Sequence, residues 1–182
     1  MKKGKLVIVS GPSGSGKSTV TKIVKDRLNI PLSISATTRH PRVGEVDGKD
    51  YYFLTTEEFE NKIKNDEFYE YANVHGNYYG TLKKVVEDNL DKGLNVILEI
   101  DVQGALIVKE KKKDAVLVFF KTENMEILEN RLRNRKTDSE EVIQTRLKNA
   151  EAELKYEDKY NYTIINENLD DSIQELIDII EG

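Results

Sequence analysis

The segment Gly11-Pro-Ser-Gly-Ser-Gly-Lys17-Ser18 has residue types and a spacing that suit the binding of a polyphosphate. Glycines let the backbone curl so that successive N–H groups point at phosphate oxygens, and a helix beginning near Gly16 adds its positive dipole end. Lys17 is placed to reach the terminal phosphates, and the Ser18 hydroxyl to ligate Mg²⁺. The sequence therefore predicts a site for a nucleoside triphosphate and Mg²⁺ at Gly11, Pro12, Ser13, Gly14, Ser15, Gly16, Lys17, Ser18 and Thr19.

A second phosphate site is predicted around Arg39 and Arg42, which stand three residues apart in a basic loop stiffened by Pro41. Guanidinium groups bind phosphate oxygens in a bidentate way that lysine cannot match. The phenols of Tyr51 and Tyr79 could donate to the same phosphate. The alternative is a solvated basic loop beside tyrosines of a core.

Glu70 lies between aromatic residues on an apparent strand and could read a nucleobase. A carboxylate accepts from two adjacent donors, which guanine offers at N1 and N2, whereas adenine presents an acceptor at N1. The hydroxyls of Ser35 and Thr81 could donate to guanine O6. Such matched polar groups discriminate strongly, because the wrong base leaves them unsatisfied. Taken alone, Glu70 fits a surface carboxylate better than a base-reading group.

Arginines also gather in a charged helical segment near the end of the chain. Arg131 and Arg135 are spaced i,i+4 on one helical face, whereas Arg133 points away, and Arg146 lies on the next helix. Arginines that close over a transferring phosphoryl group stabilise the charge on its oxygens. The alternative is an exposed helical hairpin held by ion pairs.

The elements that would position these residues alternate between strand and helix. Continuous apolar runs at residues 6–9, 96–100, 115–120 and 162–165 are typical of strands buried on both faces of a parallel sheet. Helical patterns lie between them, which predicts an α/β fold of three layers with a central parallel sheet. We expect a core of residues 1–32, 81–130 and 156–182. A mixed α+β insertion is expected at residues 33–80, and a helical one at 131–155, with helix starts at the capping boxes Thr55–Glu58 and Thr137–Glu140.

Composition limits the classes of function. The 182 residues have no cysteine and only two histidines, which excludes disulfides, thiolate zinc sites and histidine-rich metal centres. A net charge of −5 argues against nonspecific nucleic-acid binding, and the longest apolar run, residues 115–120, is too short to cross a membrane. We therefore expect a cytoplasmic protein whose metal is a hard cation held by oxygen, with homo-oligomerisation left open.

A phosphate-binding loop alone is shared by kinases, GTPases, motors and transport ATPases. GTPases read guanine with Asn-Lys-x-Asp, which does not occur here, and multidomain ATPases need a longer chain. A small protein with two insertions fits a kinase that acts on a small phosphorylated acceptor.

Several segments together resemble the guanylate kinase family, nearly from end to end and in one order. They are Gly11 to Ser18, Ser35-Ala-Thr-Thr-Arg39-His-Pro-Arg42-Val-Gly-Glu45, Gly48-Lys-Asp-Tyr51, Gly76-Asn-Tyr-Tyr79-Gly-Thr81, Leu98-Glu-Ile-Asp101-Val-Gln-Gly104 and Arg131-Leu-Arg-Asn-Arg135. The resemblance implies a P-loop NTPase fold whose insertions are a GMP-binding subdomain and a lid. It also implies transfer of the γ-phosphoryl group of ATP to GMP with Mg²⁺, as in a bacterial-type enzyme.

The resemblance also assigns roles to residues. Its catalytic set is Lys17, Arg39, Arg135 and Arg146, and it adds Arg131, Arg135 and Asn166 to the ATP site. Its GMP set is Ser35, Arg39, Arg42, Tyr51, Glu70, Tyr79, Thr81 and Asp101. Thr81 replaces a serine of some members and keeps the hydroxyl, whereas Glu99 replaces a frequent aspartate facing the loop, which changes the geometry near Mg²⁺.

Two alternative functions are considered, one in a different class of protein and one with a different phosphate acceptor. Guanylate-kinase-like domains of scaffold proteins bind phosphopeptides and lose the loop lysine or its glycines, whereas Lys17 and Ser18 are intact here. A related kinase that phosphorylates ribose 1,5-bisphosphate needs a phosphate pocket but has no use for Glu70. Adenylate and cytidylate kinases are disfavoured for the same reason.

Overall fold

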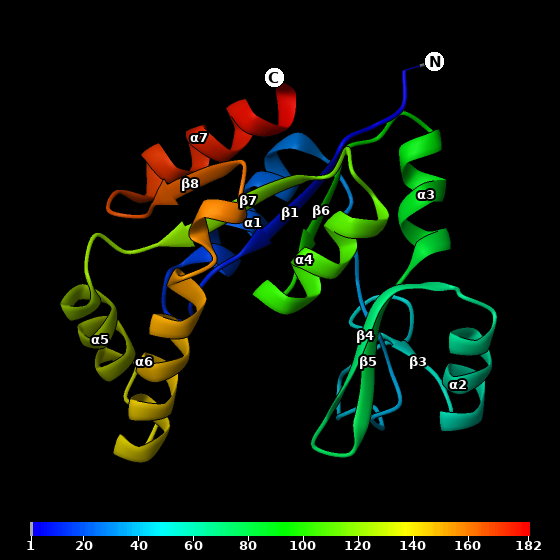
Figure 1. Cartoon of the computed structure of the whole chain (residues 1–182), viewed down its shortest axis with the longest axis horizontal. Helices are drawn as coiled ribbons and strands as arrows, with labels where there is room; N and C mark the ends of the chain where they lie inside the picture. Colours follow the sequence, from blue (N-terminus) through cyan, green and yellow to red (C-terminus); the bar gives the residue numbers. More distant parts are fainter. Residues whose placement is uncertain (1) are drawn as a thin grey trace.

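The computed structural model describes residues 2–182 and has a central parallel sheet (Figure 1). Its strands are β1 (Leu6–Ser10), β6 (Val96–Glu99), β7 (Val116–Lys121) and β8 (Tyr162–Ile165), in the order β6-β1-β7-β8. All their pairings are parallel. Each coincides with a predicted apolar run to within a residue at either end, and β1 is buried along its whole length, as expected for a strand covered on both faces.

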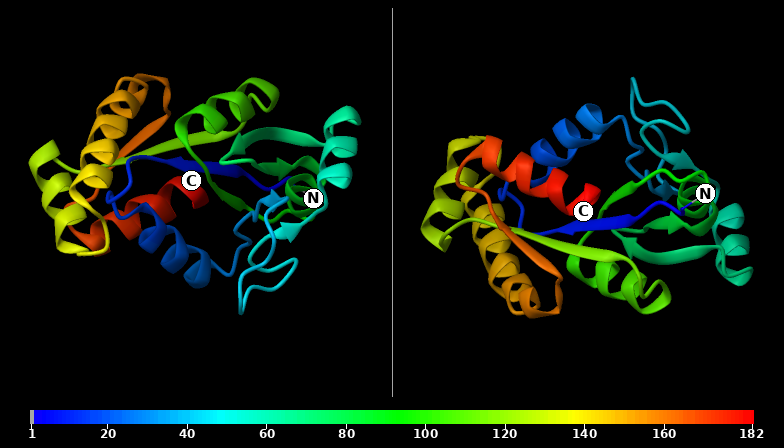
Figure 2. Two further views of the ribbon diagram at one scale, coloured as in Figure 1. Left: turned by 90° about the horizontal axis from the view of Figure 1, so that it is seen from below. Right: turned by 90° about the horizontal axis from the view of Figure 1, so that it is seen from above.

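Helices cover both faces of this sheet, as the two side views show (Figure 2). On one face α1 (Lys17–Leu28) and α7 (Leu169–Glu181) pack over a core that includes Val7, Val24 and Ile173. On the other, α3 (Lys83–Asp91) and α4 (Val102–Lys111) pack over a core that includes Ile8 and Val108. The predicted three-layer α/β fold is confirmed.

The first insertion forms a small sheet of its own. Its strands are β3 (Tyr52–Phe53), β2 (Ala36–Thr37), β5 (Asn77–Leu82) and β4 (Phe68–Val74), in the order β3-β2-β5-β4 with parallel and antiparallel pairs. Helix α2 (Thr56–Lys64) covers it through Phe59, whose ring stacks on Phe68 at 4.3 Å and on Tyr78 at 4.9 Å. The predicted capping box of Thr55 and Glu58 is confirmed at the start of α2.

The second insertion is a helical hairpin of α5 (Met125–Asn134) and α6 (Glu140–Leu154), followed by a 3-10 turn at Glu157–Lys159. Leu128, Leu132 and Ala150 form its core. The boundary expected at residue 131 falls inside α5. The capping box predicted at Thr137 is wrong, because Ser139 is the N-cap of α6 and accepts from the Val142 amide. Glu140, its expected second member, binds the Arg133 guanidinium instead.

Both insertions project beyond the same side of the core, at its opposite ends (Figure 1). Each has a hydrophobic cluster of its own, separate from the two clusters of the main sheet. Residues 31–33 run beside β6, with the Ser33 amide donating to the Ile97 carbonyl at 2.8 Å, and so tie the start of the first insertion to the core. Within residues 2–182 no helix is long and apolar enough to span a membrane.

Candidate functional site

The loop between β1 and α1 has a positive φ at Gly11, Gly14 and Gly16, and a Cβ would be most crowded at the first and the last of these. Gly11 has φ of 151°, and a Cβ there would lie 2.1 Å from the Phe120 carbonyl oxygen. Gly16 has φ of 85°, and a Cβ there would lie 2.2 Å from Asn166 Nδ2. Side chains are therefore excluded from the inner wall of the loop by both conformation and space.

The start of α1 presents free backbone donors to this loop. Its N-cap is Gly16, which has no side chain to accept from the first N–H groups of the helix, so an anion can take that place. The loop and Arg135, the C-cap of α5, line a cavity of about 140 Å³, formed by Ser13, Gly14, Gly16, Lys17, Ser18, Thr19 and Arg135. Burial lowers the pKa of Lys17, while Glu99 and Glu153 act in the opposite direction, so the ammonium lies in a partly desolvated place that suits a phosphate.

Oxygen ligands for a hard cation stand beside the same cavity. The Ser18 hydroxyl donates to Glu99 Oε1 at 2.5 Å, which joins the start of α1 to the end of β6. Among the described residues 2–182 there is no group of three or more metal-binding side chains. A hydroxyl and a single carboxylate nevertheless fit Mg²⁺, which takes few protein ligands and completes its shell with waters and substrate phosphates. Ser18 is therefore a suitable ligand, and the longer side chain of Glu99 does not keep the carboxylate from reaching it.

The arginines of the predicted lid face two directions, as their spacing indicates. Arg131 donates to the carbonyl oxygens of Ser15 at 3.4 Å and of Asn166 at 2.6 Å. Arg135, one turn on, lines the loop cavity. Arg133 points the other way and pairs with the exposed carboxylates of Glu129 and Glu140.

Arg146 reaches the loop from α6. Its Nη1 donates to Ser13 Oγ at 2.5 Å, and its Nε lies 3.1 Å from Asp138 Oδ2. Arginines from both helices of the hairpin therefore meet the phosphate-binding loop.

Asn166, expected at the ATP site, is buried behind the loop. Its Nδ2 donates to the Ser15 carbonyl at 2.8 Å, and its Oδ1 accepts from the Ser172 hydroxyl at 2.8 Å. Together with Arg131 it holds the backbone on which the phosphates would rest. One N–H bond of its amide and its Oδ1 are thus used within the protein, behind the loop.

The residues predicted for the second phosphate site converge in the first insertion. The Arg39 guanidinium carbon lies 5.3 Å from the centre of the Tyr51 ring, which meets the Tyr79 ring edge-on at 6.1 Å. The Arg42 side chain has no hydrogen-bond partner in residues 2–182 and is exposed. Two guanidinium groups and two phenols thus lie on one loop and the adjoining strand.

The predicted base-reading residues lie at the junction of the insertion with α4. The Thr81 hydroxyl donates to Glu70 Oε1 at 2.8 Å across the β4–β5 pair. Asp101 is the N-cap of α4 and accepts from the Gly104 amide. Burial raises the pKa of Glu70, the bond from Thr81 lowers it, and the charge of Asp101 raises it again.

Ser35 lies one residue before β2, where its carbonyl accepts from the Tyr52 amide at 2.9 Å. Its backbone therefore anchors β3 to this end of the insertion.

Two residues at these sites were not predicted to have a role. Glu45 binds Arg39 through both carboxylate oxygens, at 2.9 and 3.0 Å. Gly104 admits Glu70, since a Cβ there would lie 3.3 Å from Glu70 Oε2 and 2.9 Å from Asp101 Oδ1. Both lie within the segments that resemble the guanylate kinase family. The position of Glu45, three residues after Arg42, was therefore a usable indication of a role beside the predicted phosphate site.

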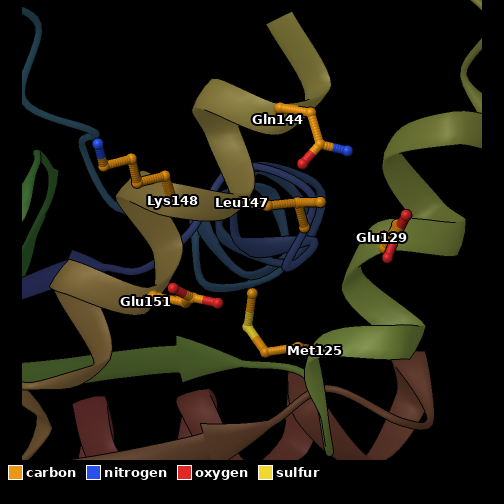
Figure 3. Close-up of a pocket in the computed structure, with 6 residues that line it drawn as sticks. All are labelled: Met125, Glu129, Gln144, Leu147, Lys148 and Glu151. Carbon is orange, nitrogen blue, oxygen red and sulfur yellow. The ribbon is translucent and has the colours of Figure 1, made fainter. Parts of the chain in front are cut away.

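Another cavity, of about 320 Å³, lies within the lid between α5 and α6 (Figure 3). Met125 and Leu147 point toward one another across it, and Glu129, Gln144, Lys148 and Glu151 complete its lining. None of the predicted site residues borders this cavity, whereas Lys17, Ser18 and Arg135 line the smaller one.

Comparisons with known proteins show the family of this chain. A sequence model described as guanylate kinase matches residues 3–182. Guanylate kinase from Fusobacterium nucleatum is 63% identical over 182 residues, covering 100% of this chain and 98% of the relative. That from Clostridium tetani is 51% identical, covering 100% and 88%. The crystal structure of guanylate kinase from Anaplasma phagocytophilum has a TM-score of 0.75 at 36% identity, covering 100% of this chain and 86% of that one. The chain therefore belongs to the guanylate kinase family.

Proposed function

We propose that the protein transfers the γ-phosphoryl group of ATP to GMP, giving ADP and GDP, at the residues described above. The observation that carries this proposal is the cavity that joins Lys17 and Ser18 of the loop to Arg135 of the lid. It presents backbone donors, an ammonium and a guanidinium in one place, as a triphosphate in transfer requires.

On the ATP side, the free N–H groups at the start of α1 and the Lys17 ammonium hold the phosphate chain. Charge spreads over the oxygens of the phosphoryl group as it leaves ADP, and positive groups placed in advance stabilise that charge. Arg135 borders the cavity, and Arg146 already contacts Ser13 at its rim. The lid thus brings the stabilising charge, while Arg131 and Asn166 hold the loop.

On the GMP side, the acceptor phosphate binds to Arg39 and Arg42, with the phenols of Tyr51 and Tyr79 as further donors. This fixes the attacking oxygen, and positioning of this kind supplies much of the rate because the transition state needs little covalent help from the protein. No strong base is required.

The guanine base is read by Glu70, with Ser35, Thr81 and Asp101 around it. The Thr81 hydroxyl donates to Glu70 Oε1, so its first role is to orient that carboxylate. Donation from Thr81 to guanine O6 requires the hydroxyl to turn once the base donates to Glu70. The burial of Glu70 strengthens its bonds to a matching base and increases the penalty for a wrong one.

Ser18 and the neighbouring Glu99 are the groups that would hold Mg²⁺ with the ATP phosphates. Mg²⁺ held there would neutralise part of the charge on the ATP phosphates. Closure of the lid and the GMP-binding insertion over the core would exclude water, which otherwise competes as acceptor.

The test is a coupled assay of ADP release with ATP and Mg²⁺ across GMP, dGMP, AMP, CMP, UMP and ribose 1,5-bisphosphate. We expect GMP to be the preferred acceptor by orders of magnitude in kcat/KM. A preference for ribose 1,5-bisphosphate, or ADP release independent of any acceptor, would refute the proposal.

A further inference from the structure

The carboxylate of Glu45 binds the end of the Arg39 guanidinium that is formed by Nη1 and Nη2. Nη1 donates to Glu45 Oε1 at 2.9 Å and Nη2 donates to Oε2 at 3.0 Å. Glu45 Oε1 also accepts from the backbone amide of Arg42 at 2.7 Å. Both side chains are largely covered, with exposed fractions of 15% for Arg39 and 19% for Glu45, which is unusual for a pair on a loop.

A count of the donors of Arg39 shows what this pairing leaves free. A guanidinium has five N–H bonds. Both bonds of Nη1 are used, one on Glu45 and one on the His40 carbonyl at 3.0 Å, and one bond of Nη2 is used on Glu45. The remaining bonds are Nε–H and the second one of Nη2, and the Tyr79 hydroxyl lies close enough to the guanidinium to interact with it. These two bonds are parallel and form the side edge of the guanidinium, a complete fork for two phosphate oxygens.

The ring beneath Arg39 and the charge around it hold this orientation. The guanidinium carbon lies 5.3 Å from the centre of the Tyr51 ring. Hydrogen bonds from Arg39 and from the Arg42 amide lower the pKa of Glu45 to about 2, so the carboxylate stays ionised at every pH at which the protein works. The bond to Glu45 and the neighbouring Tyr79 raise the pKa of Arg39.

We propose that Glu45 is a positioning residue for the acceptor phosphate, which it serves by binding the end of the Arg39 guanidinium and presenting its side edge to the substrate. The inference rests on the proposed GMP site. It assigns the Nε–Nη2 edge of Arg39 as the one that binds the phosphate. It also explains why a carboxylate stands where an anion must bind, since Glu45 and the phosphate use different edges of the same group.

A competing role for Glu45 predicts the opposite sign. If the carboxylate merely repelled the phosphate or occupied its place, its neutralisation would strengthen GMP binding, because the site would gain one positive charge. If it positions Arg39, neutralisation weakens GMP binding despite that gain. The direction of the change therefore decides between the two roles.

The experiment measures steady-state kinetics and guanosine inhibition for Glu45→Gln, with Glu60→Gln as control. Glu60 is an exposed carboxylate of α2 in the same insertion, so its variant has the same change in net charge. For Glu45→Gln we expect KM for GMP to rise about tenfold, the equivalent of one lost charge-assisted hydrogen bond. KM for ATP should stay unchanged. The inhibition constant of guanosine, which has no phosphate, should stay within about twofold of the parent value, whereas a collapsed pocket would weaken guanosine too.

Two further variants complete the test. Glu45→Asp keeps the charge but is one methylene too short to reach both nitrogens, so we expect it to restore less than half of the loss. Arg39→Gln should raise KM for GMP by about 100-fold or more. An unchanged KM in Arg39→Gln would refute the proposed phosphate site itself. A large effect in Arg39→Gln with an unchanged or lower KM in Glu45→Gln would overturn only the positioning role.

Discussion

Replacement of Glu70 by glutamine tests base recognition with almost no change in shape. The parent carboxylate has Oε1 bonded to Thr81 and Oε2 near the Gly104 end of α4. It can accept from both N1–H and N2–H of guanine. A glutamine that keeps Oε1 on the Thr81 hydroxyl puts an NH₂ group where Oε2 stood, and two donors then face each other.

The magnitude follows from the bonds that are lost. A hydrogen bond to a charged group contributes about 1.5–3 kcal/mol, and a buried donor left without an acceptor costs a similar amount. The loss of one bond, together with a donor–donor contact that is partly relieved, should cost about 3 kcal/mol of transition-state stabilisation. This lowers kcat/KM for GMP roughly 150-fold. Adenine offers an acceptor at N1 and a donor at N6, which match an amide, so AMP should gain in the variant. The ratio of GMP to AMP in kcat/KM should therefore fall by more than the loss for GMP alone.

The thermal stability of the Glu70→Gln variant should rise although its activity falls. The pKa of Glu70 is higher in the folded chain than in the unfolded one, chiefly through burial, so the native state binds a proton more readily. The ionised group thus opposes folding above its folded pKa, and this opposition fades as the pH falls through that pKa. Removal of the charge in Glu70→Gln should raise the Tm at neutral pH while it lowers activity.

The assay compares parent and variant in coupled ADP release with GMP and AMP as acceptors, together with thermal unfolding with and without ligands. KM for ATP is the internal control. Equal losses with GMP and AMP, or a loss confined to ATP, would refute a base-reading role for Glu70. A lowered Tm would refute the reasoning about its buried charge.

Three other variants test the loop and the lid. In Lys17→Ala we expect kcat to fall by about 10³-fold or more with far-ultraviolet circular dichroism unchanged, and normal turnover would exclude the phosphate role. Gly16→Ala should abolish ATP binding in calorimetry, because its Cβ would meet Asn166 Nδ2 at 2.2 Å; retained affinity would contradict the rigid loop. Arg135→Ala should lower kcat by about 10²-fold while Arg133→Ala changes it less than twofold, and equal effects would count against the assigned faces of α5.

The parts that sequence predicts well are those that depend on neighbours along the chain. The loop from Gly11 to Ser18 is contiguous, and each strand of the main sheet is an apolar run whose burial requires helices on both sides. The i,i+4 spacing of Arg131 and Arg135 predicts one shared face, and the structure places both against the loop with Arg133 turned outward.

The parts that sequence leaves open depend on pairings between distant or competing groups. Strands β2 and β3 have two residues each, and β2 pairs with β5 across some forty positions, as in Ala36 opposite Gly80. No local pattern specifies such a register. The start of α6 shows competition instead, since Thr137 and Ser139 both suit an N-cap. The capture of Glu140 by Arg133 removes the residue that would have favoured Thr137.

The net charge of −5 is compatible with the two proposed phosphate sites because the positive groups at each site are local. At the loop, Lys17, Arg131, Arg135 and Arg146 add local cations to the backbone N–H groups and the dipole of α1. In the insertion, the carboxylate of Glu45 cancels the charge of Arg39 while it fixes the direction of its remaining donors. Affinity for phosphate at the proposed sites should therefore depend on the orientation of donors as well as on the number of cations, so Glu45→Gln should weaken GMP binding although it adds a positive charge to the site.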